Sequence, residues 1–191
     1  MKLTILHTVV KNYSRYPIDI VWENAQDLEH VAWLHQKTNK AFTLLNTTRH
    51  PDSPFEYETM SYCAVRRLPL GASAKTWGMR RIVGKYNIQQ LENIPLLGIT
   101  SMLNSILRKS GRSDFPTEMV DEVVMEIPVW MAPFKSAIIK RLNRHAKIQC
   151  AEDEPFRERR QQLLERGIRL PFRIYNESVA SRISGTFKET T

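Results

Sequence analysis

A carboxylate and two imidazoles lie within nine residues near the start of the chain, at Asp27, His30 and His35. Two neutral imidazoles and one carboxylate on the same face of a metal are the protein ligands of non-haem Fe(II) sites. Asp27 and His30 are three residues apart, so on a helix they share a face. His30 and His35 are five residues apart, about 140° round a regular helix, so both reach one metal only if the helix loosens or ends before His35.

A carboxylate beside a histidine can accept the second ring N–H and fix the tautomer, which is the role that we expect for Asp27. A metal then needs a further ligand, and the best candidate is Asp153, which stands between Glu152 and Glu154. A competing interpretation makes Asp153 an ordinary helix N-cap before Pro155. It also makes the two histidines ordinary polar residues of a helix.

The elements that position these residues are predicted from hydrophobic periodicity. Alternation and β-branched residues predict strands, whereas apolar residues at helical spacing predict helices. The predicted strands cover residues 3–13, 41–48, 55–67, 75–86 and 118–130. The predicted helices cover residues 17–36, 94–109 (as a helix or a mobile lid) and 133–167, the last with a break or kink at Asp153–Pro155.

This order of elements predicts an α+β fold, in which a curved antiparallel sheet grips the long C-terminal helix and encloses an apolar cavity. We expect one domain over residues 1–175 and a flexible tail over 176–191, where polar and small residues show no periodicity. Large apolar side chains are candidates for the cavity wall, although such residues more often belong to an ordinary core. These candidates are Trp33, Phe42, Trp77, Met79 and Trp130.

Composition narrows the class of protein. The chain has 191 residues, of which 42% are hydrophobic and 25% charged, as expected for one globular domain. The net charge of +8 favours contact with an acidic protein, an anionic membrane surface or nucleic acid, but no nucleic-acid-binding motif is present, so nucleic acid is not expected. The basic run Lys140, Arg141, Arg144 and Lys147 is either a solvated helix face or a docking patch for an acidic electron carrier or anionic lipid.

The cysteines and the N-terminus bear on the cellular setting. Cys63 and Cys150 are far apart and build neither a disulfide scaffold nor a zinc ribbon, which favours a reduced compartment. The first residues lack the apolar core of a signal peptide. No apolar run approaches the roughly 20 residues of a membrane-spanning helix. We therefore expect a cytoplasmic protein.

The motif Asn24-x-x-Asp27-x-x-His30-x-x-x-x-His35, which follows a predicted strand, resembles the iron-binding motif of Rieske-type aromatic-ring-hydroxylating oxygenases. It is found in their catalytic domain, which has the helix-grip fold of the START and polyketide-cyclase superfamily. The resemblance implies that His30 and His35 are iron ligands. It also implies that Asp27 is the carboxylate that bridges toward the Rieske cluster of a neighbouring subunit.

The third ligand of that family is an aspartate on the late long helix, and residues 151–156 resemble this segment, which implies Asp153. The resemblance covers roughly residues 18–170. It implies a mononuclear Fe(II) centre that oxidises a hydrophobic, aromatic or polycyclic substrate. The chain departs from the family because it lacks the Cys-x-His and Cys-x-x-His pairs of a Rieske cluster. Electrons would then come from a separate partner protein.

Two alternatives remain open at the level of sequence. In the first, the same fold binds or transfers an apolar ligand, such as a lipid, sterol or polyketide, without a metal. In the second, the protein is a cyclase or dehydratase that uses His30 or His35 as a general base.

Overall fold

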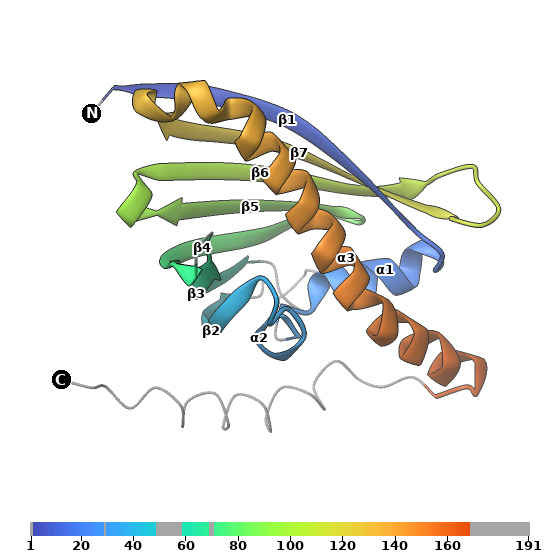
Figure 1. Ribbon diagram of the computed structural model, residues 1–191. Helices are drawn as coiled ribbons and strands as arrows, with labels where there is room; N and C mark the ends of the chain where they lie inside the picture. Colours follow the sequence, from blue (N-terminus) through green and yellow to red (C-terminus); the bar gives the residue numbers. More distant parts are fainter. Residues whose placement is uncertain (1, 29, 49–58, 69–70, 169–191) are drawn as a thin grey trace.

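The computed structural model describes residues 2–28, 30–48, 59–68 and 71–168 (Figure 1). Over these residues, seven strands form one antiparallel sheet in the order β1-β7-β6-β5-β4-β3-β2. The elements are β1 (Leu3–Ser14), α1 (Ile18–Gln26), α2 (Val31–Leu34), β2 (Asn39–Thr48), β3 (Thr59–Arg67), β4 (Ser73–Gly84), β5 (Asn87–Ile94), η2 (Pro95–Leu97), β6 (Ile99–Lys109), β7 (Thr117–Pro128), η3 (Val129–Phe134) and α3 (Lys135–Glu165).

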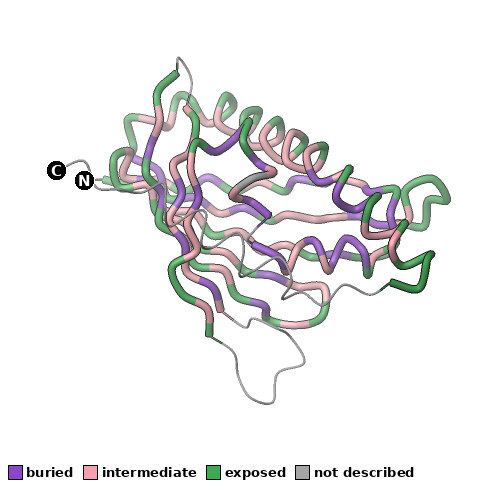
Figure 2. The backbone as a smooth tube through the Cα atoms, turned by 90° about the horizontal axis from the view of Figure 1, so that it is seen from below, coloured by how far each residue is buried: buried purple, intermediate pink, exposed green. Residues whose placement is uncertain are grey.

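The long helix α3 crosses one face of the sheet and contacts β1 and α1 (Figure 1). We call this the inner face. On β7, buried Val123, Met125 and Ile127 alternate with exposed Glu122 and Glu126, because successive side chains of a strand point to opposite faces. The buried set packs against the first turns of α3. In Figure 2 the exposed positions of α3 lie on its outward side. The predicted α+β order of a sheet and a long C-terminal helix is confirmed.

The prediction of a helix or mobile lid at residues 94–109 is wrong. The chain forms the short η2 and then β6, which pairs with β5 on one side and β7 on the other. Leu103 and Leu107 point to the inner face, whereas Met102 and Ile106 lie on the outer face, where they are exposed. Apolar residues on both faces of a strand give a pattern that resembles helical spacing. Pairing with two neighbouring strands nevertheless makes this segment a strand. Strand β5 was not predicted.

The helix predicted at 17–36 is divided in two. Helix α1 ends at Gln26, and its C-cap residue Asp27 is extended (φ −82°, ψ 97°). Helix α2 then covers only four residues. Two histidines five residues apart can reach one metal only if the helix loosens or ends before the second. The helix does end before His35.

The break predicted in the C-terminal helix is also wrong. Helix α3 is continuous over 31 residues and contains Pro155, so Asp153 lies inside it rather than at an N-cap. A proline inside a helix removes the hydrogen bond to the carbonyl four residues earlier. That carbonyl belongs to Ala151, which is exposed, so water can replace the lost partner.

The candidate cavity residues separate when the chain folds. Phe42 is buried and stacks on Tyr62, with ring centroids 5.0 Å apart. Trp77 and Met79 lie on the outer face of β4, each 45% exposed, and Trp130 in η3 is 63% exposed. The alternation of β4 places Gly78 and Arg80 inward in place of Trp77 and Met79. A cavity wall that includes these residues stays a prediction.

Some expectations fall outside the part of the chain that the structure describes. These are the side chain of Trp33, the first residues of the strand predicted at 55–67, and the tail at 176–191. No helix among the described residues is both long enough and apolar enough to cross a membrane.

A polar network occupies the inner face of β3–β5. The Tyr62 hydroxyl donates to Glu92 Oε1 at 2.6 Å, and the Arg66 guanidinium pairs with the same carboxylate. Gln90 donates to Glu92 at 3.0 Å and accepts from Arg80 Nε at 2.9 Å. Burial alone would raise the pKa of Glu92, but the Arg66 charge holds it below its ordinary value. The network places buried charge where the sequence predicts an apolar wall.

His145 on α3 should make the fold sensitive to mild acid. Burial, helped by the Arg66 charge, lowers the pKa of His145 to about 4. Between pH 6.5 and 4, His145 binds a proton in the unfolded chain but not in the folded protein, so the free energy of unfolding decreases as the pH falls. We expect about 2 kcal/mol to be lost between pH 7 and 5, as measured by chemical denaturation. A His145→Gln variant should lose that part of the slope, and an unchanged slope would contradict the assignment.

Candidate metal centre

His30 and His35 flank the four-residue helix α2. His30 is its N-cap residue, and His35 is its C-cap residue, whose N–H donates to Val31 O at 3.4 Å. Because the helix ends there, the two rings meet instead of diverging: their centroids are 5.3 Å apart, at an interplanar angle of 65°. Asp27 contributes at the start of the turn, where its Oδ1 accepts the backbone N–H of His30 at 3.4 Å.

Asp153 reaches the two rings from the middle of α3. Its Oδ1 lies 3.4 Å from His30 Nε2 and 3.2 Å from His35 Nε2. All three residues are buried, and one ligand atom from each lies within 4.8 Å of the others. The structure therefore brings the three predicted ligands together, although 118 positions separate Asp153 from His35.

The distances fit a shared divalent metal. Metal–nitrogen and metal–oxygen bonds of about 2.1 Å separate two ligand atoms by about 3.0 Å at a right angle and about 3.4 Å at a tetrahedral angle. Among the described residues, Asp153 Oδ1 is buried with no hydrogen bond of good geometry. A buried carboxylate oxygen without a well-formed hydrogen bond is costly, and a metal would satisfy it. Three protein ligands would leave coordination positions for water, substrate or O₂.

The second carboxylate oxygen is held by an arginine. Arg157 lies one helical turn after Asp153, is 3% exposed, and donates to Asp153 Oδ2 at 2.9 Å. Burial alone would raise the pKa of Asp153, but the contacts from His30 and His35 and the Arg157 charge hold it below its ordinary value. Asp153 is thus ionised, with one oxygen neutralised by Arg157 and the other directed at the histidines.

Glu152 orients His35, a role that the sequence did not reveal. Its Oε2 lies 3.0 Å from His35 Nδ1, and its Oε1 accepts the Lys37 N–H at 3.1 Å. A carboxylate on Nδ1 fixes that nitrogen as the donor and leaves Nε2 free to bind a metal. The available signal was the carboxylate next to Asp153, which a continuous helix places about 100° round the axis.

Glu152→Gln should weaken metal affinity by about 10- to 100-fold, because the carboxylate uses one oxygen for His35 and the other for Lys37, whereas glutamine has a single acceptor oxygen. Titration of the metal-free protein with Fe(II) or Co(II) measures this. Glu158→Gln is a matched control on the exposed side of the same helix. Equal affinity of the Glu152 variant and the control would contradict the orienting role.

Asp27 acts on His30 differently from the expectation. The buried Nδ1 of His30 has no hydrogen-bond partner within the described ranges, so the ring is not held by the Asp27 carboxylate. Asp27 instead binds the His30 backbone, and its Oδ2 lies 3.6 Å from Arg160 Nη2. Arg160 also pairs with Glu23 at 2.9 Å. A catalytic or bridging role for Asp27 stays a prediction.

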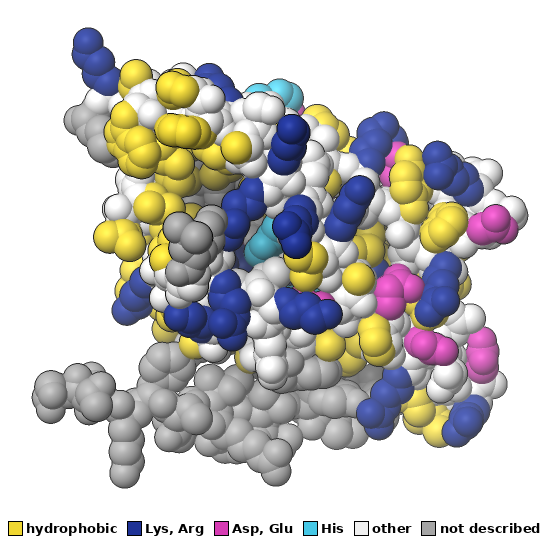
Figure 3. Space-filling view, in the orientation of Figure 1, with side chains coloured by type: hydrophobic (Ala, Val, Ile, Leu, Met, Phe, Trp, Pro, Cys, Tyr) yellow, Lys and Arg dark blue, Asp and Glu magenta, His cyan; other side chains and the backbone are white. Residues whose placement is uncertain are grey.

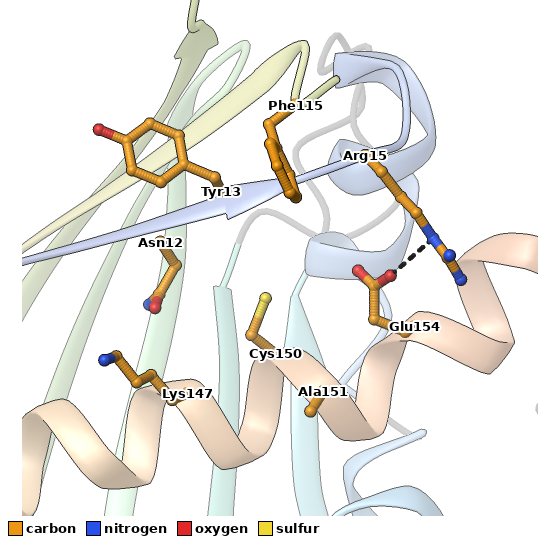
Figure 4. Close-up of a pocket in the computed structure, with 8 residues that line it drawn as sticks. All are labelled: Asn12, Tyr13, Arg15, Phe115, Lys147, Cys150, Ala151 and Glu154. Carbon is orange, nitrogen blue, oxygen red and sulfur yellow. Dashed lines mark ion pairs between the residues drawn. The ribbon is translucent and has the colours of Figure 1, made fainter. Parts of the chain in front are cut away.

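A pocket lies between α3 and β1, apart from the cluster of His30, His35 and Asp153 (Figure 4). It has a volume of about 250 Å³, and an Arg15–Glu154 ion pair at 3.0 Å lies across its end. Its lining is mixed in character: Asn12, Tyr13, Arg15, Phe115, Lys147, Cys150, Ala151 and Glu154. None of the predicted cavity residues belongs to it, and an enclosed apolar cavity stays a prediction.

Neither a family model nor a curated protein sequence matches this chain. Solved structures do resemble it. The di-domain ARO/CYC StfQ from the steffimycin biosynthetic pathway is 9% identical, with a TM-score of 0.63 over 83% of this chain and 52% of that one. Dicamba monooxygenase bound to dicamba is 12% identical, with a TM-score of 0.56 over 95% of this chain and 57% of that one. A Staphylococcus aureus protein of unknown function, SA2116, is 10% identical, with a TM-score of 0.60 over 84% and 98%.

At these identities the likeness shows the fold alone. The expected helix-grip fold is confirmed, since the sheet and its long helix match both the ARO/CYC protein StfQ and dicamba monooxygenase. The chain spans about half the length of StfQ and 57% of the monooxygenase.

Proposed function

We propose that this protein is a mononuclear non-haem iron oxygenase that oxidises a hydrophobic, aromatic or polycyclic substrate. One observation carries the proposal: two imidazole Nε2 atoms and a carboxylate oxygen that has no hydrogen bond of good geometry converge in a buried site. This is the ligand set expected for Fe(II) with open positions. The fold likeness to dicamba monooxygenase supports the same class of reaction.

Each residue of the site would have a distinct part. His30, His35 and Asp153 would hold the iron, which when bound supplies the activation of O₂. Glu152 would keep the His35 Nδ1 protonated and the ring in place. Arg157 would balance the charge of the carboxylate and shield the site from water.

Electrons for such a reaction would come from a separate protein. Cys63 lies on the outer face of β3 and Cys150 on α3, and neither belongs to a Cys-x-His pair. A hydrogen-bonded connection runs from the exposed Lys37 backbone through Glu152 to His35. We expect the electron donor to approach at this turn between α2 and β2, where the surface carries Lys37 and Lys40.

Iron analysis tests the proposal. Protein handled anaerobically and loaded with Fe(II) should hold about one iron per chain, and nitric oxide should give the S = 3/2 signal of a non-haem iron nitrosyl. His30→Ala and His35→Ala should lose both. His7→Ala is the matched control, because His7 is exposed and pairs with Glu122 at 2.9 Å. Absence of iron after reconstitution would overturn the proposal.

A second candidate is a metal-free protein that binds or cyclises an apolar ligand, supported by the fold likeness to StfQ. It predicts that apolar molecules copurify with the protein, and that their affinity is indifferent to chelators. Cyclisation with His30 or His35 as general base would proceed in chelator and without oxygen. Loss of the bound ligand on chelation would count against this candidate.

A further inference from the structure

Three large apolar side chains protrude at one end of the molecule. Leu96 in η2 is 74% exposed, and Trp130 and Phe134 in η3 are 63% and 57% exposed. The register of the sheet places both short helices at the same end, because Thr100 after η2 pairs with Glu126 before η3. We call Leu96, Trp130 and Phe134 the apolar tip. Soluble proteins rarely gather large apolar side chains in this way without a partner.

The tip cannot turn inward without unpacking the core. The neighbours Leu97 and Met131 already pack against the cluster of Leu6, Ile99, Val123, Met125 and Ile127. Proline begins η2 at Pro95 and lies within η3 at Pro133, which restricts the backbone of both turns. The fold therefore holds the three side chains outward.

Basic residues lie on the α3 and β3–β4 side of the tip, whereas Glu126 is an exposed acidic residue beside it. Figure 3 shows apolar side chains gathered at the end of the molecule that carries the N-terminus, beside a band of Lys and Arg over α3. The sequence has no Asp or Glu between Ile127 and Ala151, or between Thr59 and Leu91. Arg67 and Ser73 pair at this end of the sheet, and Arg141 on α3 donates to Arg67 O at 3.1 Å. The exposed basic rim consists of Lys2, Arg67, Lys75, Lys140 and Arg141.

We propose that this end of the protein docks on an anionic membrane surface. Trp130, Phe134 and Leu96 would enter the interface between headgroups and acyl chains, where amphipathic aromatic rings are favoured. The basic rim would lie at the level of the anionic headgroups. This inference does not depend on the proposed function, since it rests on residues outside the metal centre.

The charge and shape of the tip favour a membrane over other occupants. A second copy of the chain would bring two basic rims together, and each copy already carries a net charge of +8. A peptide segment of a partner usually docks in a groove or along a sheet edge. Here the side chains project from two separate turns at the ends of strands. An anionic surface matches both the basic rim and the outward apolar side chains.

Vesicle binding by the full chain tests the proposal. We expect sedimentation with vesicles of 30% phosphatidylserine in phosphatidylcholine at low salt, and little with phosphatidylcholine alone. The triple variant Leu96→Ser, Trp130→Ser, Phe134→Ser should bind at least about tenfold more weakly. Lys140→Gln and Arg141→Gln should each cost about fivefold and reduce the salt dependence.

The matched control is Met79→Ser with Leu91→Ser, since these side chains are 45% and 44% exposed on the outer face of the sheet. The control should bind vesicles like the original protein, and circular dichroism should show that all variants fold. Failure to sediment with anionic vesicles, or equal binding of the triple variant, would overturn the proposal. A dimer in solution that the triple variant converts to a monomer would also overturn it, in favour of self-association.

Discussion

Replacing Asp153 by alanine should abolish iron binding and destabilise the fold by about 3–5 kcal/mol. The loss of iron follows because the variant removes the carboxylate oxygen that faces both Nε2 atoms. The loss of stability follows because Arg157, which is 3% exposed, loses the nearer of its two carboxylates and keeps only the longer contact to Glu154 at 3.5 Å. Iron content after anaerobic loading and urea denaturation of the metal-free protein measure the two effects separately.

Two further variants separate the metal from the ion pair. Asp153→Asn keeps the shape and a hydrogen-bond acceptor for Arg157, so it should lose metal affinity with a smaller loss of stability. The double variant Asp153→Ala, Arg157→Met should recover much of the stability and none of the iron binding. If Asp153→Ala retained stoichiometric iron, the assignment of Asp153 as a ligand would be wrong.

Replacing Glu92 by leucine should be comparably damaging, at about 3–5 kcal/mol, because it leaves the Arg66 charge without its carboxylate on the inner face of the sheet. It also removes the acceptor of the Tyr62 hydroxyl and of Gln90. The free energy of unfolding in urea at pH 7 is the measurement.

The double variant Glu92→Leu, Arg66→Met tests whether charge imbalance is the cause. It should be more stable than Glu92→Leu alone, because it removes the Arg66 charge together with its carboxylate. Tyr62→Phe should cost less, about 1.5–3 kcal/mol, the usual range for a hydrogen bond to a charged group. A double variant as unstable as Glu92→Leu would show that packing rather than charge dominates.

The local sequence pattern predicted the structure correctly where one rule of secondary structure decided it. The alternation of β7 follows from Val123, Met125 and Ile127 against Glu122 and Glu126, and the sequence predicts this strand within a few residues. The spacing of His30 and His35 was also informative, since two side chains five residues apart on one regular helix point in different directions and cannot reach the same metal. The chain ends α2 at Leu34 and so brings the rings together.

Where the sequence failed, contacts distant in the chain decide the structure. Strand β6 carries apolar residues on both faces and becomes a strand because β5 and β7 pair with it. Asp153 lies two positions before Pro155 and resembles an N-cap, but the helix continues because its core side is packed and Ala151, whose carbonyl loses its partner, is exposed. The partnership of Glu152 with His35 spans 117 positions, which no local pattern could reveal.

The continuity of α3 has a mechanical consequence. The helix begins directly after Phe134 of the apolar tip and carries Asp153, and eighteen residue steps from Lys135 to Asp153 measure about 27 Å at 1.5 Å per residue. The two histidines belong to a different helix. Such a rod acts as a lever: a tilt of about 5° about its first turn displaces Asp153 by about 2 Å, the length of one bond from a metal to its ligand. A force applied to the first turn of α3, next to the apolar tip, would therefore change the geometry of the candidate metal centre.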